Sequence, residues 1–391
     1  MSALPAPHGD PRLRQIALAR QSVLAEGAEL TEALANAWLD RAWIMQSWRR
    51  CLALGHQPQS AVAFDAVPAR AQAHAQDAHA PLLAAARPEL QRLAAAIAPI
   101  RYFVILTDAQ GAVIDTAGAI DHRNRATHAI ARVGVDLSER SVGTSAIGAA
   151  LAERTPVWLH RGEHFFNDTA VYSCAGAPLF GPDGACLGML DVTGVDAPER
   201  PELKHLVAQS AHSIEDSLVL ARPHALRLHL AWPAGWQISG GSAGAGLLCL
   251  DADGQVTGAN ATARQMLPAL HGLALAPLHA SELFALPWAQ LFDLARRGEA
   301  AGVPLWSGLR VQVEAQQPAH PSPSAPGTAR APRSLKAVEA ELIHQAVRQA
   351  GGRVAEAARA LGLSRATVYR RLAGMPAARK RDKRAAENQG N

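Results

Sequence analysis

The chain has 391 residues, which is too long for one ordinary domain and predicts about two to four. Its hydrophobic fraction of 49% is enough to fill packed cores, so the composition excludes a wholly disordered protein. No apolar run of about 18 residues occurs, and the N-terminus has no basic segment leading into an apolar one. The sequence therefore predicts neither a transmembrane helix nor a signal peptide.

Four cysteines occur, none at CxxC spacing, which favours neither a zinc site nor a thioredoxin-like motif. So few cysteines fit a reducing compartment, and we expect a cytoplasmic protein. The net charge of +4 is unevenly distributed, because residues 333–384 carry 13 Lys/Arg against 4 Asp/Glu. A basic end on a mildly acidic body is typical of a nucleic-acid-binding segment, although a solvated basic tail has the same composition.

The first part of the chain is predicted to be helical. Residues 12–55 form one stretch, which contains Trp38, Trp43 and Trp48 and stops near Gly55. Residues 69–98 are rich in Ala, Leu and Gln and form another helical stretch. We expect a helical leader over residues 1–78.

Three β-hairpins are predicted next, each from two β-rich runs that flank a turn sequence. The first pairs residues 102–106 with 112–114, the second spans 174–192, and the third spans 247–259. Residues 141–151 are Ala-rich and predict one helix between the first two hairpins. Strands interleaved with helices indicate an α+β fold and not a doubly wound parallel sheet.

Residues 200–221 are predicted to form an amphipathic helix, because apolar residues recur at helical spacing. These residues are Leu203, Leu206, Val207, Ile214 and Leu218. Two interpretations remain open: the helix closes the first sensor domain, or it pairs with its copy in a dimer.

The C-terminal part contains a linker, a small helical module and a tail. Residues 314–334 are rich in Pro and Ala and cannot bury a core, so they predict a linker. Residues 335–375 form the module, and residues 376–391 are polar and basic and predict a disordered tail.

The module has the pattern of a helix-turn-helix. Gly351 and Gly352 end a first helix over 335–350, and a second helix starts near Arg353. Gly362 supplies a sharp turn, and Ser364 is a suitable N-cap for a third helix over 365–372. That helix presents Thr367 and Arg370 away from its apolar face, where they can meet base edges in the major groove.

The stretch GGRVAEAARALGLSRATVYRRL resembles the Fis-type DNA-binding domain, with Arg353 in place of the family's Asn. By this resemblance the DNA-facing residues are Ser364, Arg365, Thr367, Tyr369 and Arg370. Arg353 and Arg371 are better placed for phosphates, which position the module without reading sequence. Fis-type domains pair through their first helix, so a homodimer on double-stranded operator DNA is expected. The alternative is a three-helix unit that serves packing alone.

The middle of the chain resembles the GAF domain of acetoin-catabolism regulators. The resemblance lies in VGVDLSERSVGTSAIGAALAERTPVWLHRGEHF (133–165), YSCAGAPLFGPDGACLGMLDVTG (172–194) and ILTDAQGAVIDT (105–116). The leader segment QSWRRCLALG is similar as well. We expect the GAF domain over residues 79–222. The stretch LCLDADGQVTGANATARQML resembles a PAS hairpin and helix, within a degenerate PAS-like segment over 240–313.

GAF domains hold a small ligand between sheet and helices, so the resemblance implies a small-molecule effector. The candidate ligand residues are His164, Ser173, Cys174 and Asp191. Structural alternatives are a satisfied histidine for His164, an inert buried thiol for Cys174, and a strand-end carboxylate bonding backbone amides for Asp191. Gly143, Gly148 and Gly188 are expected to allow close packing. No catalytic residue, metal or cofactor is predicted.

The acetoin-regulator family usually carries an AAA+ ATPase that acts on sigma-54 RNA polymerase. The sequence has no G-x-x-x-x-G-K-[ST] phosphate loop and no GAFTGA-like loop. We therefore expect a regulator that is not an enzyme and does not hydrolyse ATP. It would act as a repressor, as an activator through RNA polymerase contact, or as a modulator of a full-length relative.

Three alternatives to this prediction remain. One is a dimerising adaptor that binds no DNA and modulates a full-length sigma-54 activator. Another is a sulfoxide reductase that uses Cys174 and Cys186, since that chemistry needs a thiolate beside a resolving cysteine. The third keeps DNA binding but makes the sensor a redox or haem switch.

Overall fold

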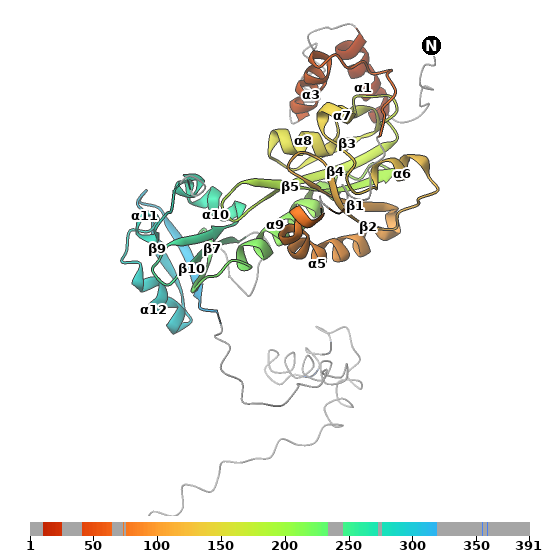
Figure 1. Ribbon diagram of the computed structural model, residues 1–391. Coiled ribbons are helices and arrows are strands. Elements are labelled where there is room, and N and C mark those ends of the chain that lie inside the picture. The colour runs from red at the N-terminus through yellow and green to blue at the C-terminus, as the bar shows by residue number, and fades with distance from the viewer. Residues whose placement is uncertain are drawn as a thin grey trace, which may run out of the picture. The chain divides into compact units, whose positions relative to one another are not determined.

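The computed structural model describes residues 11–25, 41–64, 73, 76–233, 245–272, 276–318, 354 and 358 (Figure 1). The chain divides into two compact units, residues 1–318 and 319–391. The predicted helix-turn-helix and the tail therefore lie outside the described residues, apart from Val354 and Ala358. Both of these are helical, and Ala358 is buried. Within the described residues, no helix is long and apolar enough to cross a lipid bilayer.

The first sheet has five strands in the order β2-β1-β5-β4-β3, and every neighbouring pair is antiparallel. The strands are β1 Tyr102–Asp108, β2 Val113–Gly118, β3 Val157–His160, β4 Tyr172–Phe180 and β5 Cys186–Val195. An antiparallel sheet with helices on its faces confirms the predicted α+β class.

All three predicted hairpins are present, and two of their turns share one mechanism. Asp108 Oδ1 accepts the backbone N–H groups of Gln110 and Ala112, both at 2.9 Å, in the β1–β2 turn. Asp251 does the same in the turn between β7 (Gly246–Leu250) and β8 (Val256–Ala259). An Asp that bonds the backbone two residues on is a local device, which explains why the sequence alone revealed these turns.

Helices cover both faces of the first sheet (Figure 1). On one face, α5 (Ala80–Ile97) and α9 (Leu203–Leu220) share an apolar core with β1, β4 and β5. On the other face lie three short helices: α6 Arg125–Ile130, α7 Glu139–Val142 and α8 Ala146–Glu153.

The single helix predicted over 141–151 is wrong, because the chain breaks between α7 and α8. Gly143 has a φ of +66°, a left-handed conformation that favours glycine. A Cβ there would lie 2.9 Å from Cβ of Phe165, so the position needs glycine for space as well. Ser145 then caps α8 by accepting the N–H of Gly148 at 3.1 Å.

The leader packs on the first domain through α1 (Pro11–Arg20), the π-helical turn η1 (Gln21–Ala25) and α3 (Ala42–Ala53). The buried side chains Ile44, Trp48 and Cys51 recur at helical spacing on α3. They form a core with Phe165 and Phe166, which follow the short helix η4 (Arg161–Glu163). The leader thus packs on the side of the first domain where α7 and α8 lie.

Two clusters of charge fasten this leader. Arg41 makes a bidentate pair with the buried Glu163, at 2.6 and 2.7 Å, and Arg12 reaches the same carboxylate at 2.5 Å. On α3, Arg50 makes a second bidentate pair with Glu139 at 2.7 and 2.9 Å. Bidentate arginine–carboxylate pairs fix orientation, so these two pairs hold the leader in one orientation on the first domain.

The second sheet also has five antiparallel strands, in the order β8-β7-β6-β10-β9. Its other strands are β6 Leu226–Ala231, β9 Ala300–Pro304 and β10 Arg310–Gln316, and its helices are η5 Pro268–Gly272, α10 Ala261–Met266, α11 Ala280–Leu283 and α12 Ala289–Arg297. The sheet exceeds the predicted segment 240–313 at both ends. Strand β6 lies before that segment, and β10 extends into the predicted linker. These two strands pair with each other in the middle of the sheet, although they are far apart in the sequence.

Helix α9 contributes to both sheets. Leu203, Val207, Ile214 and Leu218 lie in the core of the first sheet, so the helix closes its own domain. Val219, at its C-terminal end, packs against Leu247 and Cys249 of β7. The two sheets therefore share a helix within the first unit.

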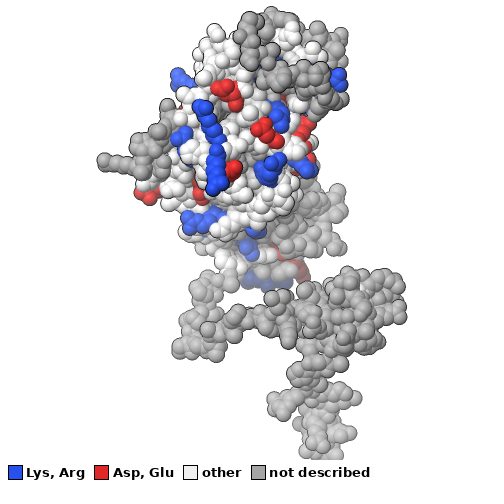
Figure 2. Space-filling model, turned by 90° about the vertical axis from the view of Figure 1, so that its right-hand side faces the viewer, with Lys and Arg blue, Asp and Glu red and all other residues white. Residues whose placement is uncertain are grey.

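On the face shown in Figure 2, basic and acidic side chains are interspersed over the described surface. That face therefore offers no continuous basic stripe of the kind that DNA-binding surfaces present.

Candidate ligand cavity

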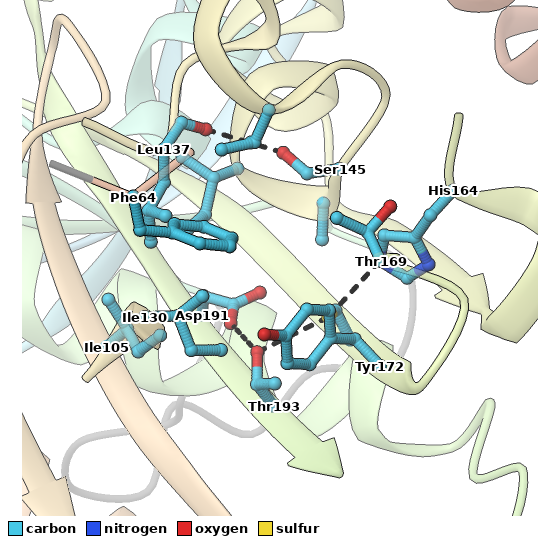
Figure 3. A pocket seen from close by; sticks show the side chains of 14 residues that line it. Phe64, Ile105, Ile130, Leu137, Ser145, His164, Thr169, Tyr172, Asp191 and Thr193 are labelled. Atoms are coloured by element: carbon cyan, nitrogen blue, oxygen red, sulfur yellow. Dashed lines mark hydrogen bonds between the residues drawn. The ribbon is translucent and has the colours of Figure 1, made fainter. Parts of the chain in front are cut away.

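A small cavity lies between strands β1, β4 and β5 and the helices α6 to α8 (Figure 3). Its free volume is about 30 Å³. Half of the lining residues are apolar: Phe64, Ile105, Ile130, Leu137, Val142, Ala146 and Ile147. The polar lining residues are Ser145, His164, Thr169, Tyr172, Cys174, Asp191 and Thr193. A few polar groups in an apolar wall are typical of a small-molecule site.

Asp191 is the most unusual group in this wall. Its side chain is 1% exposed, and its Oδ2 accepts the hydroxyl hydrogen of Thr193. Its Oδ1 is buried and has no hydrogen-bond partner in the part of the chain that the structure describes. Burial raises the pKa of Asp191 to about 7, because the charged form loses its hydration. The wall therefore contains one carboxyl oxygen that is free to bond a ligand.

His164 and Cys174 form a second polar pair. His164 Nδ1 lies 2.9 Å from the carbonyl oxygen of Arg161, so it carries the proton and donates. His164 Nε2 then accepts, and it lies 3.5 Å from Sγ of Cys174. Burial lowers the pKa of His164 to about 4 and raises that of Cys174 well above its ordinary value. Both groups are therefore neutral near pH 7.

Ser173 does not line the cavity. Its hydroxyl lies 2.7 Å from Nδ1 of His160, on the opposite face of the sheet. Successive side chains of a strand point to opposite faces, so Cys174 and Ser173 cannot both face the same cavity. The structure thus brings together three of the four predicted ligand residues and separates the fourth.

Sequence reasoning missed Thr193, Tyr172 and Phe64. Thr193 lies two residues after Asp191, and Tyr172 two residues before Cys174, so strand periodicity was a signal that could have found both. Phe64 comes from the segment after the leader helices, and its side chain meets the cavity only through the tertiary fold. No local pattern marks it.

The leader also holds the loop that carries His164. Arg20 donates to the carbonyl oxygens of Gly162 and Phe165, at 2.8 and 2.9 Å, and to that of His164. Trp48 Nε1 donates to the carbonyl oxygen of Glu163 at 2.9 Å. The position of this cavity wall therefore depends on residues more than 100 positions earlier in the chain.

The geometry opposes the cysteine-based reductase. Cys174 lies opposite Thr193 in the β4–β5 register, whereas Cys186 lies opposite Phe180. Six strand residues separate these positions, or roughly 20 Å at the usual rise per residue. Burial raises the pKa of both thiols, which disfavours a thiolate. Across the described ranges, no group of three His, Cys, Asp or Glu side chains is placed to hold a metal ion.

The predicted DNA-facing residues all lie outside the described residues. They are Arg353, Ser364, Arg365, Thr367, Tyr369, Arg370 and Arg371. Their assignment depends on the sequence and on the comparison that follows.

Residues 334–374 match the family described as bacterial regulatory protein, Fis family. This match defines the class of the protein, a DNA-binding transcription regulator with a mixed sheet-and-helix sensor region before its helix-turn-helix. Residues 14–216 match the MimR N-terminal domain. Because this match covers more than half of the chain, the chain belongs to the MimR N-terminal domain family.

Known relatives confirm the resemblance to acetoin-type regulators. The acetoin catabolism regulatory protein of Cupriavidus necator is 31% identical over 252 residues, which are 62% of this chain and 36% of that protein. The acetoin dehydrogenase operon activator AcoR of Bacillus subtilis is 28% identical over 46% of this chain and 29% of its own length. The propane 2-monooxygenase operon activator MimR of Mycolicibacterium smegmatis is 30% identical over 51% of this chain and 32% of its own length.

The matched part thus spans about a third of the length of these relatives. Among solved structures, the crystal structure of the E. coli DhaR(N)–DhaL complex covers 71% of this chain and 99% of that chain, with 16% identity and a TM-score of 0.43.

Proposed function

We propose that this chain regulates transcription in response to a small uncharged metabolite bound in the cavity around Asp191. The observation that carries this proposal is the buried Oδ1 of Asp191, which has no partner among the described residues and faces an apolar cavity. A buried acceptor without a partner costs free energy, and a ligand hydrogen bond would recover it.

The chemistry of the wall narrows the ligand class. With a pKa of about 7, Asp191 donates to a carbonyl when protonated and accepts from a hydroxyl when ionised. An organic anion would lie next to this carboxyl group in an apolar environment, and this disfavours binding of an anion. The names of two relatives, which refer to acetoin catabolism and to propane oxidation, also concern small uncharged compounds.

Calorimetric titration of the full chain tests this ligand class, with acetoin and 2-propanol as uncharged probes and lactate as the anionic one. We expect Asp191→Leu to weaken binding of the uncharged probe about ten-fold or more, since it removes one hydrogen bond to a charged or neutral carboxyl group. Ser173→Ala is the matched control, because that buried side chain faces away from the cavity. Unchanged affinity in Asp191→Leu, or tighter binding of lactate, would contradict the proposal.

We further propose that the output is an ATP-independent change in the affinity of a cytoplasmic homodimer for operator DNA, with RNA polymerase as a contact in activation. The Fis-family match at 334–374 supports the DNA-binding part, and the sequence offers no phosphate loop between residues 195 and 334. Gel shifts over a salt series test it, because phosphate contacts release counterions and binding falls steeply with salt. An adaptor would shift no fragment at any salt concentration.

A further inference from the structure

A second hollow is lined by the turn of the β4–β5 hairpin and by α10 of the second sheet. Its free volume is about 380 Å³. Basic side chains dominate its charged lining: Arg154, Arg264 and His271. None of these residues belongs to the cavity around Asp191, so this hollow is a separate feature.

The walls of this hollow are fixed by hydrogen bonds between the two sheets. Glu215 of α9 accepts the N–H groups of Phe180 and Ala261, at 2.9 and 3.2 Å. The N–H of Ala259 donates to the carbonyl oxygen of Pro182 at 2.9 Å. Both oxygens of the buried Glu215 bond the backbone, and its carboxylate also acts on Arg264 through space, so it offsets part of the positive charge of the hollow.

Arg264 is the buried cation of the hollow, with 6% of its surface exposed. Its Nη1 donates to the carbonyl oxygens of Gly181, at 3.2 Å, and of Ala259. Its Nη2 is buried and has no hydrogen-bond partner among the residues that the structure describes. A guanidinium presents several donors in a rigid fork and binds oxyanions in two-point geometry, so an unpartnered guanidinium nitrogen beside the hollow suits an oxyanion.

Arg154 supplies the second guanidinium. Its carbon Cζ lies 5.9 Å from the centre of the Phe180 ring, and that of Arg264 lies 5.7 Å from the same centre. Asp183 is the acidic residue of the lining, but its Oδ1 accepts the N–H of Ala185 and its Oδ2 lies 3.7 Å from Arg222. The ion pairs found between described residues include neither Arg154 nor Arg264. Positive charge therefore exceeds negative charge around the hollow.

We propose that this hollow binds an oxyanion, the phosphate or carboxylate group of a small second effector, between Arg154 and Arg264. Phe180 holds both guanidiniums in place, and the open Nη2 of Arg264 bonds the anion. The bound anion bridges the C-terminal end of α8, where Arg154 lies, and α10 of the second sheet, which carries Arg264. This ligand class is anionic, whereas the class proposed for the Asp191 cavity is uncharged, so the two sites take different molecules.

Calorimetric titration of the full chain at constant ionic strength tests this site, with inorganic phosphate and succinate as the two probes. We expect saturable binding of at least one probe, and roughly ten-fold weaker binding in Arg154→Gln, the loss expected for one charge-assisted hydrogen bond. Arg101→Gln is the matched control, because Arg101 is also exposed and left-handed (φ +59° against +53°) but precedes β1 at the far end of the sheet. Its affinity should equal that of the unmodified chain.

The outcomes separate the two sources of the anion. Binding of phosphate alone assigns the site to phosphate compounds, and binding of succinate alone assigns it to carboxylates. Arg264→Lys keeps the charge but loses the fork, so it should also weaken binding while the apo-protein keeps its melting temperature within a few degrees. No saturable binding, or equal affinities in Arg154→Gln and Arg101→Gln, would overturn the proposal, including the case in which phosphate binds only the basic C-terminal segment.

Discussion

Asp191 and Thr193 lie two residues apart on β5, and the hydroxyl of Thr193 satisfies one carboxyl oxygen of Asp191 while the other stays open to the cavity. Residues i and i+2 of a strand share a face, so the sequence spacing itself creates this arrangement. Cys174 lies opposite Thr193 in the sheet register, with its sulfur 3.3 Å from the Thr193 hydroxyl oxygen. The pair is therefore held in a fixed orientation with one acceptor left for a ligand.

The buried acids should make stability fall as pH rises. Burial raises the pKa of Asp191 from 3.8 to about 7, and that of Glu215 from 4.5 to about 7. A group with a raised pKa binds its proton more tightly when folded, so its contribution is complete below the unfolded pKa and is lost as pH rises through the folded pKa. We expect the contribution of these two acids to the free energy of unfolding of the apo-protein to decrease between about pH 5 and about pH 8.

Asp191→Asn should remove its share of that decrease, on the order of 2–3 kcal/mol. Urea unfolding at both pH values measures the difference. The matched control is Asp253→Asn, an exposed position whose carboxylate stays in water, which should leave the pH dependence as it is. An equal decrease in Asp191→Asn and the unmodified chain would show that Asp191 is not the buried acid responsible.

Glu163→Gln should loosen the leader. This change leaves the Arg41 guanidinium, which is 15% exposed, without its bidentate carboxylate, and breaking a buried pair by removing one partner costs about 3 kcal/mol. We expect a lower urea midpoint and faster tryptic cleavage at Arg12 and Arg20. Glu202→Gln breaks the exposed pair with Arg200 and should cost less than about 0.5 kcal/mol. Equal midpoints for the two variants would contradict this account of the leader.

Gly188→Ala should be among the most damaging small substitutions in the first sheet. A Cβ at Gly188 would lie 2.0 Å from the backbone oxygen of Thr107, so the paired strands β1 and β5 would have to separate. We expect a loss of roughly 3 kcal/mol or more, measured by thermal or urea unfolding, or no soluble protein. Gly302→Ala is the matched strand position, where the nearest atom is 3.5 Å away, and it should be tolerated. Similar losses in both variants would point to backbone flexibility instead of the close approach.

Arg370→Ala should reduce operator affinity by roughly 1–3 kcal/mol, the usual contribution of a good base contact, and should relax specificity at one base pair. Arg371→Ala, at a position expected to contact phosphate, should weaken binding uniformly and reduce the salt dependence. Footprinting and anisotropy titrations on a fixed fragment separate the two effects. An unchanged footprint and affinity in Arg370→Ala would refute its assignment to the DNA-facing side.

The hairpins could be predicted from the sequence because their signals are local. Asp108 and Asp251 bond the backbone within four residues, and glycine follows in each turn. Strands β6 and β10 are not joined directly by such a turn, and their pairing joins residues more than 80 positions apart, which no local pattern reveals. The break at Gly143 was missed for a similar reason, since Phe165 makes glycine necessary there.

The candidate site shows the same difference between what local sequence signals predict and what depends on tertiary packing. His164, Cys174 and Asp191 were predicted from the resemblance to a GAF domain, and the structure places all three around one cavity. Ser173 was assigned to the same site although alternation along β4 turns it away. Phe64 could not be predicted, because this residue joins the cavity wall through tertiary packing alone.

Helix α9 has a consequence for how such regulators can be recombined. Its apolar stripe fills one sheet's core while Val219 covers strand β7 of the next, so any crossover point near residue 220 would strip one partner of its covering. A chimaera designed to fold should therefore keep both sheets from one parent, with its junction after Pro318, where the first unit ends.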